Sequence, residues 1–317
     1  MAFRVARSPQ EWRSLSEGER APGKQRGSVI SVGNFDGLHI GHQKIIHAVM
    51  ENARTENALA AVITFDPHPL KILRPEAAPP LIMTITQRVA GFADAGLDAA
   101  LVMRFDRALA DLSAEDFVRT ILVETVRAKR ILVGQNFRFG YKQAGNVHLL
   151  VRLGAEFGFG VDIIGAAEVN GKPVSSTEIR RAVSEGRVVE ASALLGHPFA
   201  LTGTIQPGAG RGSKIVYPTL NLSAEQELLP ARGVYATECV IDGSTYHSVT
   251  NIGVRPTFDG QDSSIESHLF DFNHSRENDR LEVRFWNRLR DERKFAGADA
   301  LKAQIALDIS AAQEFFK

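Results

Sequence analysis

The sequence predicts two domains of different fold class, an α/β domain followed by an all-β domain that ends in a helix. In the first half, apolar strand-like runs alternate with stretches whose apolar residues recur at helical spacing, which favours right-handed crossovers and a parallel sheet. Beyond residue 198 the pattern changes to short strands at close spacing, which is typical of a sandwich or a barrel. A length of 317 residues is enough for two hydrophobic cores.

The composition excludes several classes of function. Lys and Arg together number 37, as do Asp and Glu, so no net field favours nucleic acid as a partner. No apolar run reaches the ~18 residues that a membrane span needs, and residues 1–13 lack the apolar region of a signal peptide. The single cysteine, Cys239, allows neither an internal disulfide nor a cysteine-based metal site. We therefore expect a cytoplasmic protein that binds neither membrane nor nucleic acid.

The first domain is predicted to cover residues 1–185. Residues 1–26 are charged and poorly periodic, which predicts a loop. Ser113, followed three residues later by Asp116, is typical of a capping box at a helix start. The predicted strands are 28–32, 59–65, 99–103, 130–133 and 161–164, and the predicted helices are 43–55, 88–95, 113–122 and 147–157.

The stretch from Val32 to His42, V-G-N-F-D-G-L-H-I-G-H, connects the first of these strands to a helix. Its glycines permit close approach of the backbone to a ligand, and the helix start offers unpaired N–H groups that suit a phosphate. His39 and His42 are three residues apart, so both rings can point the same way on an early helical turn. A loop with two solvated histidines is the alternative, but His-x-Gly-His directly after a strand favours phosphate binding.

Three further stretches are expected at the same edge of the sheet, where the ligands of parallel sheets bind. In the stretch at 175–181, Ser176 or Thr177 can cap a helix that begins there, and Arg180, one turn later, can bind phosphate oxygens. Phe137 and Phe139 alternate with an arginine, which would suit a flat ring system beside a cation. The three stretches are residues 65–69, F-D-P-H-P, residues 134–140, G-Q-N-F-R-F-G, and residues 175–181, S-S-T-E-I-R-R.

The second domain is predicted to cover residues 186–317. The predicted strands are 199–205, 236–241, 246–252, 265–270 and 281–285, and they are followed by an amphipathic helix over 298–316. A basic, glycine-rich loop at 207–214 lacks the glycine that a P-loop has before its lysine, so composition leaves a flexible hairpin tip and a phosphate loop equally open. The candidate binding residues of this loop are Gly210, Arg211, Gly212 and Lys214.

The longer form of the first motif, G-N-F-D-G-L-H-I-G-H, resembles the bacterial FAD synthetases that also carry riboflavin kinase, a branch of the nucleotidylyltransferase superfamily. T-F-D-P-H-P, V-G-x-N-F-x-F-G and S-S-T-x-I-R recur in that family in the same order. The resemblance implies a Rossmann-like nucleotidylyltransferase domain in which His39, His42 and Arg180 stabilise charge on the transferring phosphorus and Phe65 borders the isoalloxazine. The other residues that it implies for nucleotide or flavin binding are Gly33, Phe35, Asp36, Gly41, Asn136, Phe137, Ser176 and Thr177.

In the second half, the stretch Y-P-T-L-N at 217–221 resembles the P-T-A-N motif of riboflavin kinases, and G-V-Y-A, N-I-G-V-R-P-T and E-S-H-L match that family too. The resemblance implies a small antiparallel barrel in which Thr219 and Asn221 bind Mg²⁺ and ATP. Hydroxyl and amide oxygens suit such a hard cation. It also implies that Arg255 contributes to binding and that Glu266 is the catalytic base.

The two implied reactions need different groups. A flavin phosphate that attacks the α-phosphorus of ATP is already ionised, so it needs positioning and charge stabilisation but no general base. The riboflavin hydroxyl keeps its proton at pH 7, so its attack on the γ-phosphorus needs a base such as Glu266. We therefore expect a bifunctional enzyme that uses MgATP to convert riboflavin to FMN and FMN to FAD.

Other functions stay open, because some residues depart from the pattern of this family and some motifs are shared with other families. Val216 and Leu220 stand where the family has glycine and alanine, and residues 273–279 lack the expected D-L-Y-G stretch. These changes favour an FAD synthetase whose second half is a degenerate flavin-binding module. A cytidylyl- or pantetheine-type transferase and a flavin sensor are further candidates, whereas a class I aminoacyl-tRNA synthetase would need a K-M-S-K-S run that the chain lacks. The expected partners are small-molecule substrates, and the sequence leaves open a homo-oligomer or transient contact with apo-flavoproteins.

Overall fold

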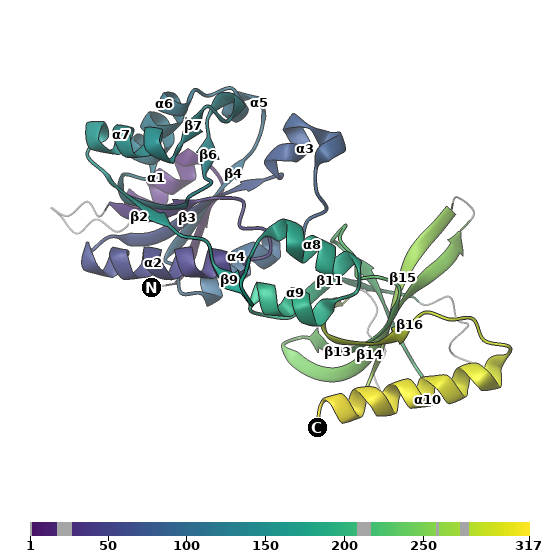
Figure 1. Ribbon diagram of the computed structural model, residues 1–317. Helices are drawn as coiled ribbons and strands as arrows, with labels where there is room; N and C mark the ends of the chain where they lie inside the picture. The colour runs from purple at the N-terminus through teal and green to yellow at the C-terminus, as the bar shows by residue number, and fades with distance from the viewer. Residues whose placement is uncertain (1, 18–26, 208–216, 258–259, 273–278) are drawn as a thin grey trace. The chain divides into compact units, whose positions relative to one another are not determined.

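The computed structural model describes residues 2–17, 27–207, 217–257, 260–272 and 279–317 (Figure 1). The chain forms two compact units, of which the first comprises residues 1–79 and 85–174 and the second comprises residues 80–84 and 175–317. The expected functional boundary at 185/186 lies further along the chain than this structural one, so residues 175–185 belong to the barrel-bearing unit. Where the two activities divide stays a prediction.

The first unit is built on a parallel sheet. Its principal strands are β1 (Arg4–Ala6), β2 (Ser28–Val32), β3 (Leu59–Asp66), β4 (Ala99–Arg104), β5 (Ala128–Gly134) and β8 (Gly160–Ile164). Within the described residues these six strands lie in the order β1-β4-β3-β2-β5-β8, and every neighbouring pair is parallel. The predicted α/β class of the first half is therefore confirmed.

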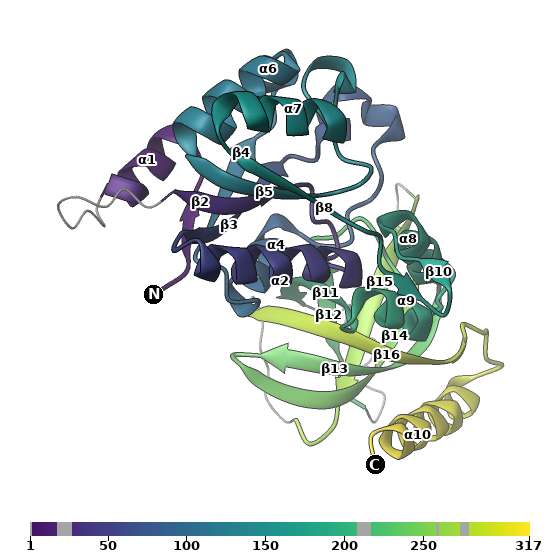
Figure 2. The ribbon, with the colours of Figure 1, turned by 60° about the vertical axis from the view of Figure 1, so that its left-hand side comes forward.

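Helices cover both faces of this sheet. They are α1 (Pro9–Glu17), α2 (Ile40–Thr55), α3 (Pro69–Leu73), η1 (Pro75–Ala77), α4 (Ile85–Asp94), α5 (Arg107–Ala110), α6 (Ala114–Phe117), the π-helix η2 (Val118–Thr125), η3 (Tyr141–Gln143) and α7 (Val147–Phe157). Two short antiparallel pairs, β6 (Arg138–Phe139) with β7 (Gly145–Asn146) and β9 (Glu168–Val169) with β10 (Lys172–Pro173), complete the unit. α2 and α4 lie on one face, and α1, α6 and α7 lie on the other (Figures 1 and 2).

Burial explains why β2 lies near the centre of the sheet. All of its residues, S-V-I-S-V, are buried, as expected for a parallel strand covered on both faces. α2 contributes buried Ile46, Val49 and Ala53. Ser113 caps α6 by accepting a hydrogen bond from the backbone N–H of Asp116 at 3.0 Å, which confirms the predicted capping box.

The prediction of a loop over residues 1–26 is wrong for its first part. β1 pairs with β4 at the edge of the sheet, and α1 follows with Trp12 only 3% exposed. A strand of three residues is too short to show an alternating pattern, so periodicity could not reveal it. Residues 18–26 lie outside the described residues.

The second unit contains a closed antiparallel barrel. Its elements are α8 (Ser176–Ser184), α9 (Val188–Leu195), β11 (Phe199–Gln206), β12 (Leu220–Ala224), β13 (Gly233–Ile241), β14 (Ser244–Thr257), β15 (Gly260–Leu269), β16 (Arg280–Asp291) and α10 (Ala298–Phe315). The strands close in the order β11-β12-β15-β14-β13-β16. The structure thus decides for the barrel and against the sandwich, and it confirms the terminal helix.

A buried ion pair attaches α10 to the barrel. Asp308 of α10 accepts hydrogen bonds from Nε and Nη2 of Arg290 on β16, at 2.9 and 2.7 Å. Ala312 of α10 packs beside Val234 and Val249 in a small apolar cluster on the barrel. In the described part of the chain, no helix is both long enough and apolar enough to cross a membrane.

Candidate functional site

The loop after β2 lies at the carboxyl edge of the sheet, between β3 and β5. The backbone N–H of Gly33 donates to the carbonyl of Ile63 at 3.0 Å, which joins the start of the loop to β3. Phe35 and Leu38 have φ of 51° and 42°, and Gly37 has φ of 90°. Such left-handed values are unfavourable for large side chains and cluster at ligand-binding loops. The loop therefore has the strained geometry typical of a functional site.

The predicted histidine pair forms at the start of α2. His39 is the N-cap residue, and its Nδ1 accepts the backbone N–H of His42 at 3.3 Å. The two rings stack with centroids 3.6 Å apart and planes 14° apart. A Cβ at Gly41 would lie 3.1 Å from Cε1 of His39, so glycine leaves the ring its room. The structure thus brings together His39, His42 and the unpaired N–H groups of a helix start.

The surroundings of His42 keep its ring neutral. Phe35 approaches it edge-on at 5.2 Å, and its buried Nδ1 has no hydrogen-bond partner among the described residues. Burial lowers the pKa of His42 well below its usual value, and the charges of His39 and Arg88 lower this pKa further. A neutral imidazole beside a helix start can donate one N–H to a phosphate oxygen. Asp36, 2% exposed, lies in the same loop.

The residues predicted to bind the flavin ring or the nucleotide near β3 and β5 differ in their exposure. Phe65 ends β3 half-buried, and Asn136 is exposed in the turn after β5. Phe137 is half-buried and stacks on Phe139 with centroids 5.4 Å apart. Phe139 itself is 6% exposed within the hydrophobic core, so the structure assigns this ring to packing rather than to a ligand.

Sequence reasoning missed two residues at this edge. Phe105 lies directly after β4 and packs edge-on against Phe65 at 5.7 Å. Arg88 of α4 is buried beneath the loop. A helical arginine is usually exposed, so the pattern alone gave no reason to expect a buried one. For Phe105, the signal was its position after a strand that ends at the same edge.

The third predicted stretch begins α8 and therefore lies in the second unit. Ser175, rather than Ser176 or Thr177, is the N-cap, and its hydroxyl accepts the backbone N–H of Glu178 at 3.3 Å. A cap must have extended backbone, and Ser175 has φ of −147° and ψ of 151°. Arg180 donates from Nε to the carbonyl of Pro80 at 2.8 Å, within the same unit.

On the barrel, the strand register aligns the predicted kinase residues in one row. Asn221 of β12 lies opposite Glu266 of β15, and Glu266 lies opposite Asn251 of β14. Directly opposite residues share a face of the sheet, so these three side chains are neighbours. The next residue of β15, Ser267, is fully buried and bonded to Thr250 at 2.8 Å inside the barrel. Glu266 therefore faces the outer side.

The P-T-L-N loop is held against this row by His268. Nδ1 of His268 lies 2.8 Å from the carbonyl oxygen of Pro218, and its ring meets Tyr217 edge-on at 5.4 Å. Thr219, exposed, follows directly and precedes Asn221 by two residues. Gly210, Arg211, Gly212 and Lys214 lie outside the described residues, and so does the side chain of Arg255, whose backbone belongs to β14.

The donor set at this loop suits magnesium rather than a softer metal. Thr219 and Asn221 offer a hydroxyl and an amide oxygen beside the carboxylate of Glu266, and hard cations prefer oxygen ligands. Among the residues that the structure describes, no group of three or more His, Cys, Asp or Glu side chains could hold a metal ion.

Two protein families match the two halves of the chain. Residues 21–178 match the family model described as FAD synthetase, and residues 195–316 match the one described as riboflavin kinase. The bifunctional riboflavin kinase/FMN adenylyltransferase of Escherichia coli (strain K12) is 36% identical over 293 residues, which cover 92% of this chain and 94% of that protein. The protein of the same name from Pseudomonas fluorescens is 36% identical over 291 residues, which cover 92% and 93%.

A solved structure is also similar over its whole length. It comes from Streptococcus pneumoniae, was named a macrolide-efflux protein, and matches with a TM-score of 0.84 at 28% identity over 99% of both chains. The likeness concerns the fold.

Proposed function

This chain belongs to the family of bifunctional riboflavin kinases/FMN adenylyltransferases, and from that premise we propose how its residues divide the two reactions. The carboxyl-terminal half phosphorylates riboflavin to FMN, and the amino-terminal half adenylylates FMN to FAD, with ATP as the second substrate of both. The observation that carries the division is the stacked pair His39 and His42 at the start of α2, a site that suits a phosphate group.

For FMN adenylylation, the loop after β2 binds the triphosphate. The phosphate of FMN attacks the α-phosphorus of ATP, and pyrophosphate leaves. His39 and His42 donate hydrogen bonds to the phosphate oxygens, and the N–H groups of α2 add positive partial charge. Gly33, Phe35, Asp36 and Gly41 shape this loop, Asn136 contacts the nucleotide, and Phe65 and Phe137 border the flavin ring. The nucleotide contacts predicted for Ser176, Thr177 and Arg180, which belong to the second unit, stay predictions.

For riboflavin phosphorylation, Glu266 accepts the proton of the riboflavin hydroxyl as that oxygen attacks the γ-phosphorus of ATP. Thr219 and Asn221 would hold Mg²⁺, which neutralises phosphate charge when bound. Gly210, Arg211, Gly212, Lys214 and Arg255 complete the ATP site in this proposal.

The departure at Leu220 does not favour a degenerate kinase. Leu220 lies opposite Ser267, whose side chain is in the barrel interior, so the larger residue adds packing there rather than bulk at the row of Glu266. Val216, the other departure, lies outside the described residues. We propose further that the protein acts in the cytoplasm, as its single buried cysteine suits, and that any homo-oligomer or contact with apo-flavoproteins is secondary to the small-molecule substrates.

The test is to incubate the purified chain with ATP, Mg²⁺ and either riboflavin or FMN, and to separate the flavins by chromatography. We expect riboflavin to give FMN and then FAD, and FMN to give FAD directly. FAD from FMN with riboflavin left untouched would contradict the kinase assignment, and neither product would contradict the proposal as a whole.

Variants assign the residues. Glu266→Gln should remove nearly all FMN formation while FAD formation from supplied FMN continues, because only the hydroxyl needs a base. The matched control is Glu238→Gln, a glutamate on β13 whose carboxylate lies beside His247. His42→Ala should give the reverse pattern, with His47→Ala, exposed on the same helix, as its control. Equal loss of both activities in either variant would contradict the division.

A further inference from the structure

Arg88 of α4 links the two loops that meet at the adenylylation site. Its side chain is 1% exposed. Its Nη1 donates to the backbone carbonyl of Asn34 at 2.7 Å, to Oγ1 of Thr64 at 3.1 Å and to the carbonyl of Phe65 at 3.4 Å. Asn34 belongs to the phosphate loop, whereas Thr64 and Phe65 end β3. One guanidinium nitrogen therefore fixes the phosphate loop relative to the predicted flavin ring contact.

The rest of α4 supports the same loop. Phe92, one turn after Arg88, packs edge-on against Phe35 with centroids 5.5 Å apart. A Cβ at Gly91 would lie 2.2 Å from Cδ1 of Leu38, so only glycine allows helix and loop this approach. Both Phe35 and Leu38 have positive φ, which costs energy unless neighbouring packing holds it. α4 supplies that packing.

Packing alone does not explain the charge of Arg88. Its Nε and Nη2 are buried and have no hydrogen-bond partner among the described residues. Burial lowers the pKa of Arg88, and the charges of Asp36 and Asp66 oppose that effect. A buried cation that is not fully paired is costly, and an apolar residue of similar size would fill the space more cheaply. A buried polar group left unsatisfied in a native structure calls for an explanation, and a functional role is one of them.

We propose that Arg88 is a positioning residue for FMN adenylylation, which fixes the phosphate loop against the end of β3 and places a permanent positive charge near the paired imidazoles. The inference rests on the proposed function of the first unit. The positive charge of Arg88 disfavours a second positive charge on His42, which has His39 as its other charged neighbour. Arg88 thus helps to place the loop that carries the phosphate-binding group, and its charge adds to the burial and the His39 charge that keep His42 neutral.

Two substitutions separate position from charge. Arg88→Gln removes the positive charge and the planar guanidinium group with its N–H donors. Arg88→Lys keeps the charge but cannot reproduce the planar donor geometry of that group. We expect kcat for FMN adenylylation to fall about 100-fold in Arg88→Gln and about tenfold in Arg88→Lys. Riboflavin phosphorylation, measured on the same preparation, should stay within about twofold of wild type, because it uses the barrel.

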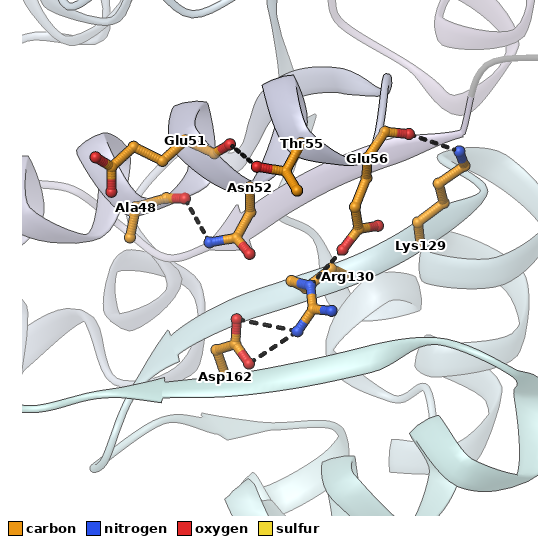
Figure 3. A network of polar contacts seen from close by, with 8 residues as sticks. All are labelled: Ala48, Glu51, Asn52, Thr55, Glu56, Lys129, Arg130 and Asp162. Carbon is orange, nitrogen blue, oxygen red and sulfur yellow. Dashed lines mark hydrogen bonds and ion pairs between the residues drawn. The ribbon is translucent and has the colours of Figure 1, made fainter.

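The matched control is Arg130→Lys. Arg130, on β5, is likewise held between elements, since its guanidinium bonds Glu56 after α2 and both carboxylate oxygens of Asp162 on β8 (Figure 3). It pairs with Val29 and Gly160 at the amino ends of their strands, opposite the edge that carries the site. Arg130→Lys should lose stability but keep kcat for FMN adenylylation.

A spectroscopic readout distinguishes positioning from support of the fold. NMR titration of histidine-labelled protein, with His42→Gln used to assign the signal, should show His42 titrating at a higher pH in Arg88→Gln than in wild type and at an unchanged pH in Arg88→Lys. Unchanged titration and full adenylylation in a folded Arg88→Gln protein would overturn the inference. If Arg88→Gln fails to fold, kcat of Arg88→Lys decides, and full FMN adenylylation by a folded Arg88→Lys protein would overturn the inference. A wild-type chain that makes no FAD would overturn the proposed function instead.

Discussion

At the scale of single residues, the histidine pair links local geometry to chemistry. His39 caps α2 and stacks on His42, and Gly41 between them leaves space for the first ring. The second ring is neutral because it is buried beside His39 and Arg88. The site therefore recognises phosphate by directed N–H groups and a helix start, with the fixed positive charge placed on an arginine that cannot lose it.

The lowered pKa of His42 predicts how stability depends on pH. At pH 7.5 the ring of His42 is neutral in both the folded and the unfolded chain, so its lowered pKa does not reduce the free energy of unfolding. Below the usual value of 6.5 the unfolded chain takes up a proton that the folded protein disfavours, so the free energy of unfolding falls as the pH falls. The loss should extend down to the lowered folded pKa.

Urea unfolding at pH 7.5 and 5.5 checks this prediction. Trp12 is buried in the first unit, and Trp286→Phe would leave it as the single tryptophan, so its fluorescence reports that unit. The midpoint should fall more between the two pH values in the protein with His42 than in His42→Gln. An equal fall in both would show that His42 is not responsible.

At the scale of elements, two helices hold the functional strands from outside. α4 supports the loop after β2, as argued from Arg88, Gly91 and Phe92. α10 packs against one side of the barrel. Its ion pair with β16 is mostly buried, since the side chains of Asp308 and Arg290 are 7% and 20% exposed. In each case a charged side chain, rather than the apolar stripe alone, fixes the helix.

Breaking the ion pair of α10 should destabilise the barrel. Asp308→Ala leaves the guanidinium of Arg290 half-buried and unpaired, which costs about 3 kcal/mol. Replacing both partners, in Asp308→Leu with Arg290→Met, should recover most of that stability because no charge is left without a partner. Urea unfolding followed by Trp286, with Trp12→Phe, measures both. An Asp308→Ala protein as stable as wild type would contradict the assigned role of the ion pair.

At the scale of the whole molecule, the sequence predicted the two fold classes because periodicity survives in long elements. The buried run of β2 predicted a strand of a parallel sheet, whereas the short strands after residue 198 left both a sandwich and a barrel open. β1 was missed because three residues carry no period, and the cap of α8 was placed one or two residues too late within a run of hydroxyl residues, S-S-T.

Site residues could be predicted from the sequence where a motif lies at the end of a strand. They could not be predicted where a contact between distant parts of the chain determines the position of the residue. The pair His39 and His42 forms as expected from the motif, whereas the pairing of Asn221 with Glu266 follows from the strand register and was not predicted. Arg88 was missed because burial of a helical arginine depends on the loop that packs over it. Phe139 was read as a ligand contact because a buried ring and a binding ring look alike in sequence.

The central claim is that the histidine pair of the first unit and Glu266 of the second unit serve two separate reactions, and complementation tests it most directly. Equal amounts of Glu266→Gln and His42→Ala protein are mixed with riboflavin, ATP and Mg²⁺, and FAD is followed by chromatography, with each variant alone as control. The account predicts that His42→Ala alone accumulates FMN, that Glu266→Gln alone leaves riboflavin unchanged, and that the mixture makes FAD. A mixture that forms FMN but no FAD, although Glu266→Gln adenylylates supplied FMN, would contradict it.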